Sequence, residues 1–187
     1  CDDWCFNTPK VKSIKLSSTN ENFILTDNDN NKIENNENDN AEAINQGCIL
    51  YNNDKTVLYF VCRNVKQLVI PNTVKRIAAS ACQFAQLEEL TFEEGSQLED
   101  IERSAFFGCK LKVLNNLPKS VRIIGDFAFN SNRLLEKVTF EEESQIQYIG
   151  VGAFASCGLK GKSCFNCPSS QICKIGKGCF ESNKKFE

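Results

Sequence analysis

Residues 97–114 read QLEDIERSAFFGCKLKVL, and this pattern decides the fold because the chain repeats it twice more. It returns as SVRIIGDFAFNSNRLLEKV in residues 120–138 and as SQIQYIGVGAFASCGLKG in residues 144–161. In every copy an alanine–phenylalanine pair ends five residues after an isoleucine; the pairs are Ala105-Phe106, Ala128-Phe129 and Ala153-Phe154. Such repetition is typical of a solenoid, in which each repeat stacks on the next.

A shorter phrase marks the repeat over a longer part of the chain. It is a valine, leucine or isoleucine followed three residues later by an isoleucine, and these isoleucines are Ile77, Ile101, Ile124, Ile149 and Ile175. The steps between them are 24, 23, 25 and 26 residues. One unit cannot bury its own apolar side, so we expect the isoleucines and phenylalanines to form columns between stacked repeats.

A third phrase predicts short strands. Apolar residues two positions apart recur at Leu68/Ile70, Leu90/Phe92 and Val138/Phe140. This alternation places every second side chain in the core. The copy with Leu111 and Leu114 departs from the phrase, because Asn116 stands at its last apolar position. Ordinary amphipathic helices are the alternative, but the repeated positions are too rich in β-branched residues for helices.

The composition argues against several classes of function. The chain has 187 residues and a formal net charge of -2, so no basic field is present to attract nucleic acid or anionic lipid. It has no histidine, which removes the histidine dyads of hydrolases. No apolar run approaches the ~20 residues that span a bilayer. We therefore expect no catalysis, no cofactor and no membrane span. Because methionine is also absent, we expect Cys1 to follow a processing site or a fragment boundary.

Cysteine is abundant for a chain of this length. Eleven cysteines suggest an oxidising location, and the odd number leaves at least one unpaired within the chain. If residues 48–51 and 57–62 form a hairpin in which Tyr51 faces Tyr59, then Cys48 faces Cys62. Further disulfide candidates are Cys167 with Cys173, and Cys1 with Cys5.

The same cysteines allow a metal site to be considered. Cys164-x-x-Cys167, followed by Cys173 and Cys179, could hold zinc through four thiolates. Cys164 and Cys179, however, stand at core positions of the repeat, so we predict no metal site. Cys109 and Cys157 also stand at repeat positions, and we expect them to be buried and unreactive.

The quoted phrases, together with VIPNTVKRIAASAC in residues 69–82, resemble the BspA-like leucine-rich repeat family. The resemblance implies an α/β repeat solenoid: a right-handed leucine-rich-repeat superhelix with a parallel concave sheet of short strands and little regular helix. Members of the family are known chiefly as surface or secreted proteins, and some are adhesins. The resemblance therefore also implies an extracellular or cell-surface location. Ala78, Cys82 and Asn132 depart from the family pattern.

Three segments are expected along the chain. Residues 1–66 form an N-terminal cap with a first strand near Ile14 and Leu16, an Asn/Asp-rich loop from Thr26 to Glu42, and the hairpin. Residues 67–162 form four repeats of about 24 residues, and residues 163–187 form a modified repeat or C-terminal cap. The loop has almost no apolar groups, so burial cannot offset its ordering entropy.

The predicted partner surface is the concave sheet. Its outward strand positions and flanking columns are Gln67, Val69, Glu89, Thr91, Glu93, Val113, Asn115, Lys137, Thr139, Glu141 and Ser163. This stripe is small and polar, which suits extended contact with a protein or a glycan better than a deep small-molecule pocket. The acidic turns at Glu93 and Glu141 could meet a basic partner, although a solvated edge is the commoner reason for such turns.

These observations predict a non-catalytic recognition or adhesion module that binds a protein or carbohydrate partner. No nucleic-acid partner is expected, since arginine and lysine are scattered and are not interleaved with aromatic residues. The alternative is an intracellular structural or scaffold protein in which the repeats act as a rigid spacer. The state of the thiols separates the two: disulfides favour the first hypothesis and free thiols the second.

Overall fold

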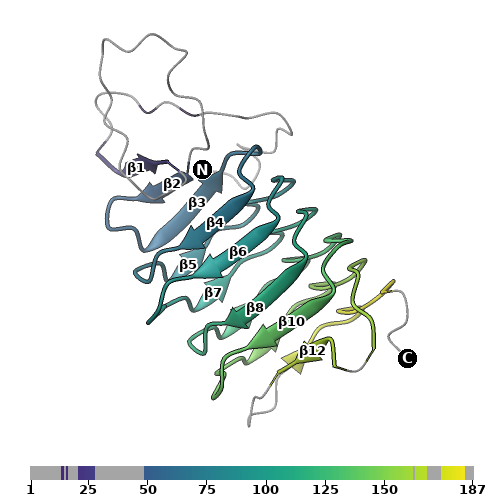
Figure 1. The fold of residues 1–187 in the computed structure, drawn as a ribbon. Helices are drawn as coiled ribbons and strands as arrows, with labels where there is room; N and C mark the ends of the chain where they lie inside the picture. The colour runs from purple at the N-terminus through teal and green to yellow at the C-terminus, as the bar shows by residue number, and fades with distance from the viewer. Residues whose placement is uncertain are drawn as a thin grey trace.

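The computed structural model describes residues 14, 16, 21–27, 49–161, 163–167 and 174–183. Within these residues the chain forms a parallel-strand solenoid, with two rows of strands running along its length (Figure 1). The predicted solenoid is therefore confirmed. The α/β label is not, because the described residues contain strands and turns but no helix. The handedness and curvature of the superhelix stay predictions.

One row, which we call the short-strand sheet, has eight strands in the order β1-β2-β3-β5-β7-β9-β11-β13, of which the last five have two residues each. Each later strand contributes the end of the isoleucine phrase, so that Ile77 pairs with Ile101, Ile101 with Ile124, and Ile124 with Ile149. These four side chains are at most 1% exposed. The predicted isoleucine column is thus confirmed for these four residues, whereas Ile175 pairs with Ile149 at its end but is 53% exposed. The strands are β1 (Phe23–Thr26), β2 (Ile49–Asn52), β3 (Val57–Val61), β5 (Arg76–Ile77), β7 (Asp100–Ile101), β9 (Ile123–Ile124), β11 (Tyr148–Ile149) and β13 (Lys174–Ile175).

The other row has four strands of four or five residues and the two-residue β12, and we call its outward side the long-strand face. It is divided into two sheets: one pairs β4 with β6, and the other has the order β12-β10-β8. Figure 1 shows all five strands side by side in front of the short-strand sheet. No ladder joins β6 to β8 in the described part of the chain. The strands are β4 (Gln67–Ile70), β6 (Glu89–Phe92), β8 (Val113–Leu117), β10 (Lys137–Phe140) and β12 (Phe165–Asn166).

Each repeat turns a corner after its short strand, and the phenylalanines stack there. The rings of Phe106 and Phe129 lie 5.1 Å apart, and those of Phe129 and Phe154 lie 5.2 Å apart, nearly parallel in both pairs. Main-chain bonds follow the same column: the N–H of Phe106 donates to Ala128 C=O, and the N–H of Phe129 donates to Ala153 C=O, both at 2.8 Å. The predicted phenylalanine column is confirmed.

The corners are turns because each contains two left-handed residues four positions apart. A left-handed φ at every fourth residue interrupts the run of right-handed torsions that a helix needs. Most of these residues are serine or glycine, the exceptions being Phe84 and Phe127; the set is Ser80, Phe84, Ser104, Gly108, Phe127, Ser131, Gly152, Ser156, Gly178 and Ser182.

The N-terminal hairpin is present, but its register differs from the prediction. β2 and β3 pair antiparallel with Ile49 opposite Val61, and an irregularity then places Leu58 opposite Tyr51. The predicted Tyr51–Tyr59 pairing is therefore wrong, since the irregularity shifts β3 by one residue. The Ile49–Val61 register is the one that the Cys48–Cys62 disulfide assumes, but Cys48 lies outside the described residues and the disulfide stays a prediction.

The first strand lies later in the chain than expected. Ile14 and Leu16 pack against the core without belonging to a strand, whereas β1 pairs antiparallel with β2. Thr26, predicted to open the polar loop, is instead fully buried at the end of β1. The reason is that the strand extends the hairpin sheet and not the repeat pattern. Residues 28–42 of the predicted loop lie outside the described residues.

Candidate functional site

A groove of about 1570 Å³ lies on the long-strand face. Its walls come from β4, β6 and β8, with Asp27 and Glu141 adding a side chain each. It is therefore a broad surface depression over three strands. The lining residues are Asp27, Asn64, Lys66, Gln67, Val69, Glu88, Glu89, Leu90, Thr91, Phe92, Lys112, Val113, Asn115, Asn116 and Glu141.

The structure brings seven of the eleven predicted surface residues together in this groove. They are Gln67, Val69, Glu89, Thr91, Val113, Asn115 and Glu141. Glu93, Lys137 and Thr139 lie on or next to the long strands but do not line the groove. The alternation of strand side chains was enough to predict six of the seven, because outward positions of neighbouring parallel strands share one face. Glu141 follows β10 and was predicted as part of a flanking column.

Ser163 was assigned to the wrong position. It is exposed but precedes β12, and the residue opposite Thr139 is Asn166. Cys164 likewise lies before the strand, where its C=O accepts a bond of 2.7 Å from Val138 N–H. The chain from residue 157 to β12 is longer than the same connection in earlier repeats, so the constant 24-residue spacing placed Ser163 three positions too early.

The groove coincides with the missing ladder between β6 and β8. On either side the entry to the long strands is bonded: Glu88 N–H donates to Lys66 C=O at 2.7 Å, and Glu136 N–H donates to Lys112 C=O at 2.9 Å. The equivalent bond from Lys112 N–H to Glu88 C=O does not form. Within the described residues, that N–H and that C=O have no main-chain partner.

Proline removes a bond at the other end of the same junction. After the strands, Glu93 N–H donates to Ile70 C=O at 3.0 Å, and Glu141 N–H donates to Leu117 C=O at 2.9 Å. The residue that follows β8 is Pro118, which has no N–H to donate to β6. The long-strand face is therefore divided into a two-stranded and a three-stranded sheet, and β6 and β8 meet without a ladder.

Asn116 is an extra residue in β8. Val138 of β10 pairs with Leu114, and Phe140 pairs with Leu117, so two residues of β8 lie opposite Thr139. Asn116 has a φ of 51°, and its N–H donates to Thr139 Oγ1 at 2.9 Å. This is a β-bulge, in which asparagine tolerates the left-handed torsion. Leu117, not Asn116, is the buried residue that closes the phrase.

The charges along one rim of the groove alternate. Lys66, Glu88, Lys112 and Glu136 occupy equivalent positions just before the long strands. Lys112 Nζ lies 3.2 Å from Glu88 Oε2, so a side-chain ion pair spans the junction where the main-chain bond is missing. Lys160 Nζ lies 3.4 Å from Glu136 Oε1 in the next pair. Exposed pairs of this kind contribute at most about 1 kcal/mol and open readily.

The acidic turns at the other rim have an internal role. Glu93 Oε2 accepts a hydrogen bond of 2.9 Å from Asn72 N–H, and Glu141 Oε2 accepts one of 3.0 Å from Lys119 N–H. Each carboxylate thereby holds the turn of the preceding repeat. A solvated edge that stabilises neighbouring turns explains both residues.

The exposed apolar part of the groove is aliphatic. Val69 and Val113 are 40% and 38% exposed, and Phe92 is the aromatic side chain among the lining residues, half-buried at the end of β6. Carbohydrate sites commonly stack a sugar on an exposed aromatic face, as aromatic faces bind amphipathic ligands well. The groove walls instead supply amides, carboxylates, hydroxyls and aliphatic patches.

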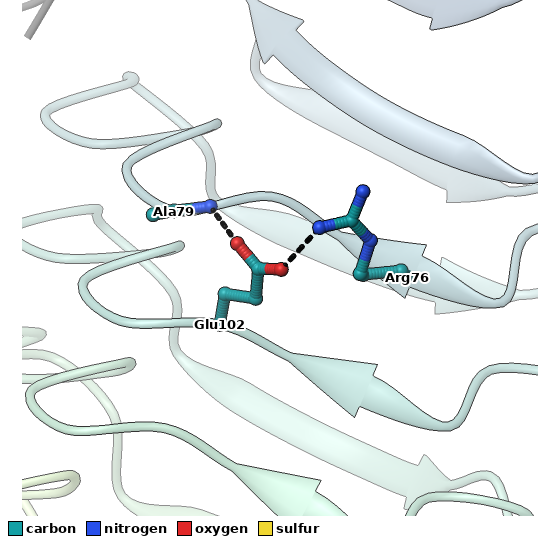
Figure 2. Close-up of polar contacts among 3 residues, drawn as sticks. All are labelled: Arg76, Ala79 and Glu102. Carbon is teal, nitrogen blue, oxygen red and sulfur yellow. Dashed lines mark hydrogen bonds and ion pairs between the residues drawn. The ribbon is translucent and has the colours of Figure 1, made fainter. Parts of the chain in front are cut away.

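The short-strand edge carries a different polar cluster. Figure 2 shows Glu102 between Arg76 and the main chain of Ala79. Arg76 Nη1 lies 2.5 Å from Glu102 Oε1, and Ala79 N–H donates to Glu102 Oε2 at 2.8 Å. Burial, together with the nearby Glu102 charge, raises the pKa of Asp100. Asp126 similarly accepts a bond of 2.8 Å from Val151 N–H. Glu102 and Asp126 thereby tie neighbouring corners together.

The cysteines of the repeat are buried, as predicted for Cys109 and Cys157. Burial raises the pKa of the Cys109 and Cys157 thiols to about 12 and raises that of Cys82 well above its usual range. Cys82 stands where later repeats have the stacked phenylalanine. Thiols of this kind are poor nucleophiles, because the reactive thiolate is scarcely populated.

The predicted metal and disulfide positions are only partly described. Cys164 and Cys179 are buried at core positions, and Cys167 is half-buried. Among the described residues, no group of three cysteine or carboxylate side chains is arranged as metal ligands. Cys173, Cys1 and Cys5 lie outside those residues, so the pairs Cys167–Cys173 and Cys1–Cys5 stay predictions. A helix able to cross a bilayer is likewise not found in the described part of the chain.

Comparison with known proteins places this geometry in a family. The "BspA type Leucine rich repeat region" matches residues 54–187 in 6 copies. No curated protein matches the chain. The crystal structure of the pneumococcal vaccine antigen PcpA is similar, with a TM-score of 0.55 and 24% identity over 70% of this chain and 32% of that one.

A leucine-rich repeat protein from Eubacterium ventriosum ATCC 27560 is also similar, with a TM-score of 0.50 and 22% identity over 74% of this chain and 50% of that one. The chain thus spans about a third to a half of the length of these two structures, and at this identity they show the fold alone. Six family repeats, stacked as the structure shows, establish that the chain belongs to the BspA-type leucine-rich repeat family.

Proposed function

We propose that this protein is a non-catalytic recognition module that binds a protein partner through the groove on the long-strand face. The single observation that supports it best is the groove itself, since it gathers six outward residues of three neighbouring strands together with Glu141. Leucine-rich repeats form a family of protein-interaction modules, and the polar, open groove suits an extended polypeptide contact.

The groove chemistry favours a polypeptide over a carbohydrate. Its exposed apolar groups are the aliphatic Val69 and Val113, whereas a sugar ring would gain most from an exposed aromatic face. Glu89 accepts a hydrogen bond from Gln67 Nε2 at 2.9 Å, so its negative charge is not balanced by a cation there. A partner with aliphatic and basic side chains would complement both features.

Two aspartate substitutions, one in the groove and one on the short-strand sheet, test the proposal. Val113 in the groove and Ile123 on the short-strand sheet are 38% and 39% exposed. Val113→Asp and Ile123→Asp therefore each replace a β-branched strand residue of similar exposure with a negative charge. Polypeptides selected on the wild-type protein from a displayed library of folded domains and random peptides should bind Val113→Asp about tenfold more weakly or worse. Their affinity for Ile123→Asp should be unchanged.

The opposite pattern would contradict the proposal. Binders that tolerate Val113→Asp but lose affinity for Ile123→Asp would place recognition on the short-strand sheet. A panel of immobilised glycans, tested with the same two variants, covers the carbohydrate alternative. If only glycans bound, and Val113→Asp weakened their binding, the groove would remain the proposed site but its partner would be a carbohydrate.

We further propose an extracellular or cell-surface location, with adhesion as the biological role. The content of eleven cysteines and the family relationship support it. Mass spectrometry of the native protein without reduction should find at least two disulfides, with Cys48–Cys62, Cys167–Cys173 and Cys1–Cys5 as the expected pairs. Eleven free thiols would instead favour an intracellular scaffold that uses the repeats as a rigid spacer.

A further inference from the structure

We infer that the junction between β6 and β8 is a docking site for a peptide in extended conformation, whose main chain bonds to the main-chain groups that the broken ladder leaves open. This inference rests on the proposed function of the groove and names the form of its partner. It goes further in assigning the contact to one place, the junction at Glu88 and Lys112, and to backbone hydrogen bonding.

The first argument is the location of the open groups. Lys112 N–H and Glu88 C=O have no main-chain partner in the described part of the chain, and both residues line the groove. The pair is one donor and one acceptor at the entries to β8 and β6, and an extended peptide presents the complementary acceptor and donor. A ligand that excludes water from these main-chain groups and forms hydrogen bonds to them is stabilised by those bonds.

The second argument is a sequence feature of β8, the strand on one side of the junction. Leu68-Val69-Ile70-Pro71 in the first repeat corresponds to Leu114-Asn115-Asn116-Leu117-Pro118, which is one residue longer. The extra residue is the bulged Asn116, and it lines the groove. β-Bulges are frequent next to functional sites, where they end strand pairing or redirect side chains.

The third argument is the chemistry around the open groups. Val69 and Val113 provide exposed aliphatic surface on the strands to either side of β6. Alternate side chains of an extended peptide point to one face, so two of them would reach these patches while the main chain bonds at the junction. The exposed ion pair between Lys112 and Glu88 opens at little cost and frees a cation and an anion for the peptide.

Deletion of Asn116 tests the inference directly. The deletion gives the third repeat the length of the first, so β8 should pair with β6 and close the junction while Val69 and Val113 stay on the face. A peptide selected on the wild-type protein from a displayed random-peptide library should bind the deletion variant about tenfold more weakly or worse. Hydrogen exchange of the free variant should show newly protected amides at Lys112 and Val113.

A second measurement needs no variant. Addition of the same selected peptide to the wild-type protein should slow amide exchange at Lys112, and it should leave exchange at Glu136 unchanged because that amide is already bonded. Should the deletion variant fail to fold, this readout alone decides the question. Unchanged exchange at Lys112 in the saturated complex would overturn the inference.

The outcomes separate this inference from the proposed function. A peptide that binds the deletion variant as well as wild type, yet is lost with Val113→Asp, would leave the groove as the binding face and overturn junction docking. A peptide insensitive to both changes would remove the groove from recognition altogether. A groove that selects folded domains or glycans but no peptide would also overturn the inference.

Discussion

At the scale of single residues, the stacked phenylalanines are the largest identical side chains that adjacent repeats share. Phe129 is fully buried between the rings of Phe106 and Phe154. Phe129→Ala should lower the free energy of unfolding by about 3–5 kcal/mol, because it leaves a cavity with a neighbour on each side. Phe84→Ala is the control, as Phe84 is 40% exposed, and it should cost about 1 kcal/mol or less. Urea denaturation of both variants measures the difference, and similar values for the two would contradict the stacked column.

Gly150 illustrates how closely the corners approach one another. A Cβ at this position would lie 2.4 Å from the main-chain nitrogen of Asp126, and the backbone there cannot yield as a flexible side chain would. Gly150→Ala should therefore destabilise the protein by about 2 kcal/mol or more. At Gly95, with a φ of +73° and open space around it, alanine should cost only the torsional strain of about 1 kcal/mol. Thermal unfolding of the pair checks the prediction, which fails if Gly95→Ala is the more harmful change.

At the scale of the element, one corner position supplies a donor to the carbonyl of the stacked phenylalanine. Asn132 Nδ2 donates to Phe106 C=O and to Phe129 C=O, both at 2.8 Å, while Cys157 Sγ lies 3.3 Å from Phe129 C=O. Asn132→Ala leaves two buried carbonyls without this donor and should cost about 2–4 kcal/mol. Asn132→Cys restores the side chain used one repeat later and should recover part of the loss. Equal stabilities of the two variants, measured in urea, would contradict this role.

The elements also show which features could be predicted from the sequence. The isoleucine and phenylalanine columns could be predicted, because the same residue type recurs at the same position of successive repeats. The outward residues of β4 and β6 could be predicted for the same reason. The broken ladder could not, since Asn116 reads as a defective copy of the strand phrase until Leu117 is seen to be buried in its place. The position of β12 could not be predicted either. The final connection is longer than the earlier ones, so Asn166 and not Ser163 lies opposite Thr139.

At the scale of the whole molecule, the solenoid is continuous on two of its sides and interrupted on the third. β5 pairs with β7 beside the junction, and Cys82 N–H donates to Ala105 C=O across it at the corner, at 2.7 Å. Neighbouring repeats in a solenoid stabilise each other through such interfaces. These two sets of contacts bridge the place where β6 and β8 do not pair, so we expect the repeats to unfold together.

Buried thiols distributed along the chain test this expectation. Cys82 precedes the junction, Cys109 lies beside it and Cys157 follows it, and burial raises the pKa of all three. In the native protein at about pH 8, all three should resist alkylation by iodoacetamide, since their folded pKa values lie far above that pH. With increasing urea, mass spectrometry should find the three labelled with one common midpoint. If Cys82 became reactive at clearly lower urea than Cys157, the N-terminal repeats would unfold separately, and the missing ladder would outweigh the short-strand sheet and the corner bonds that cross it.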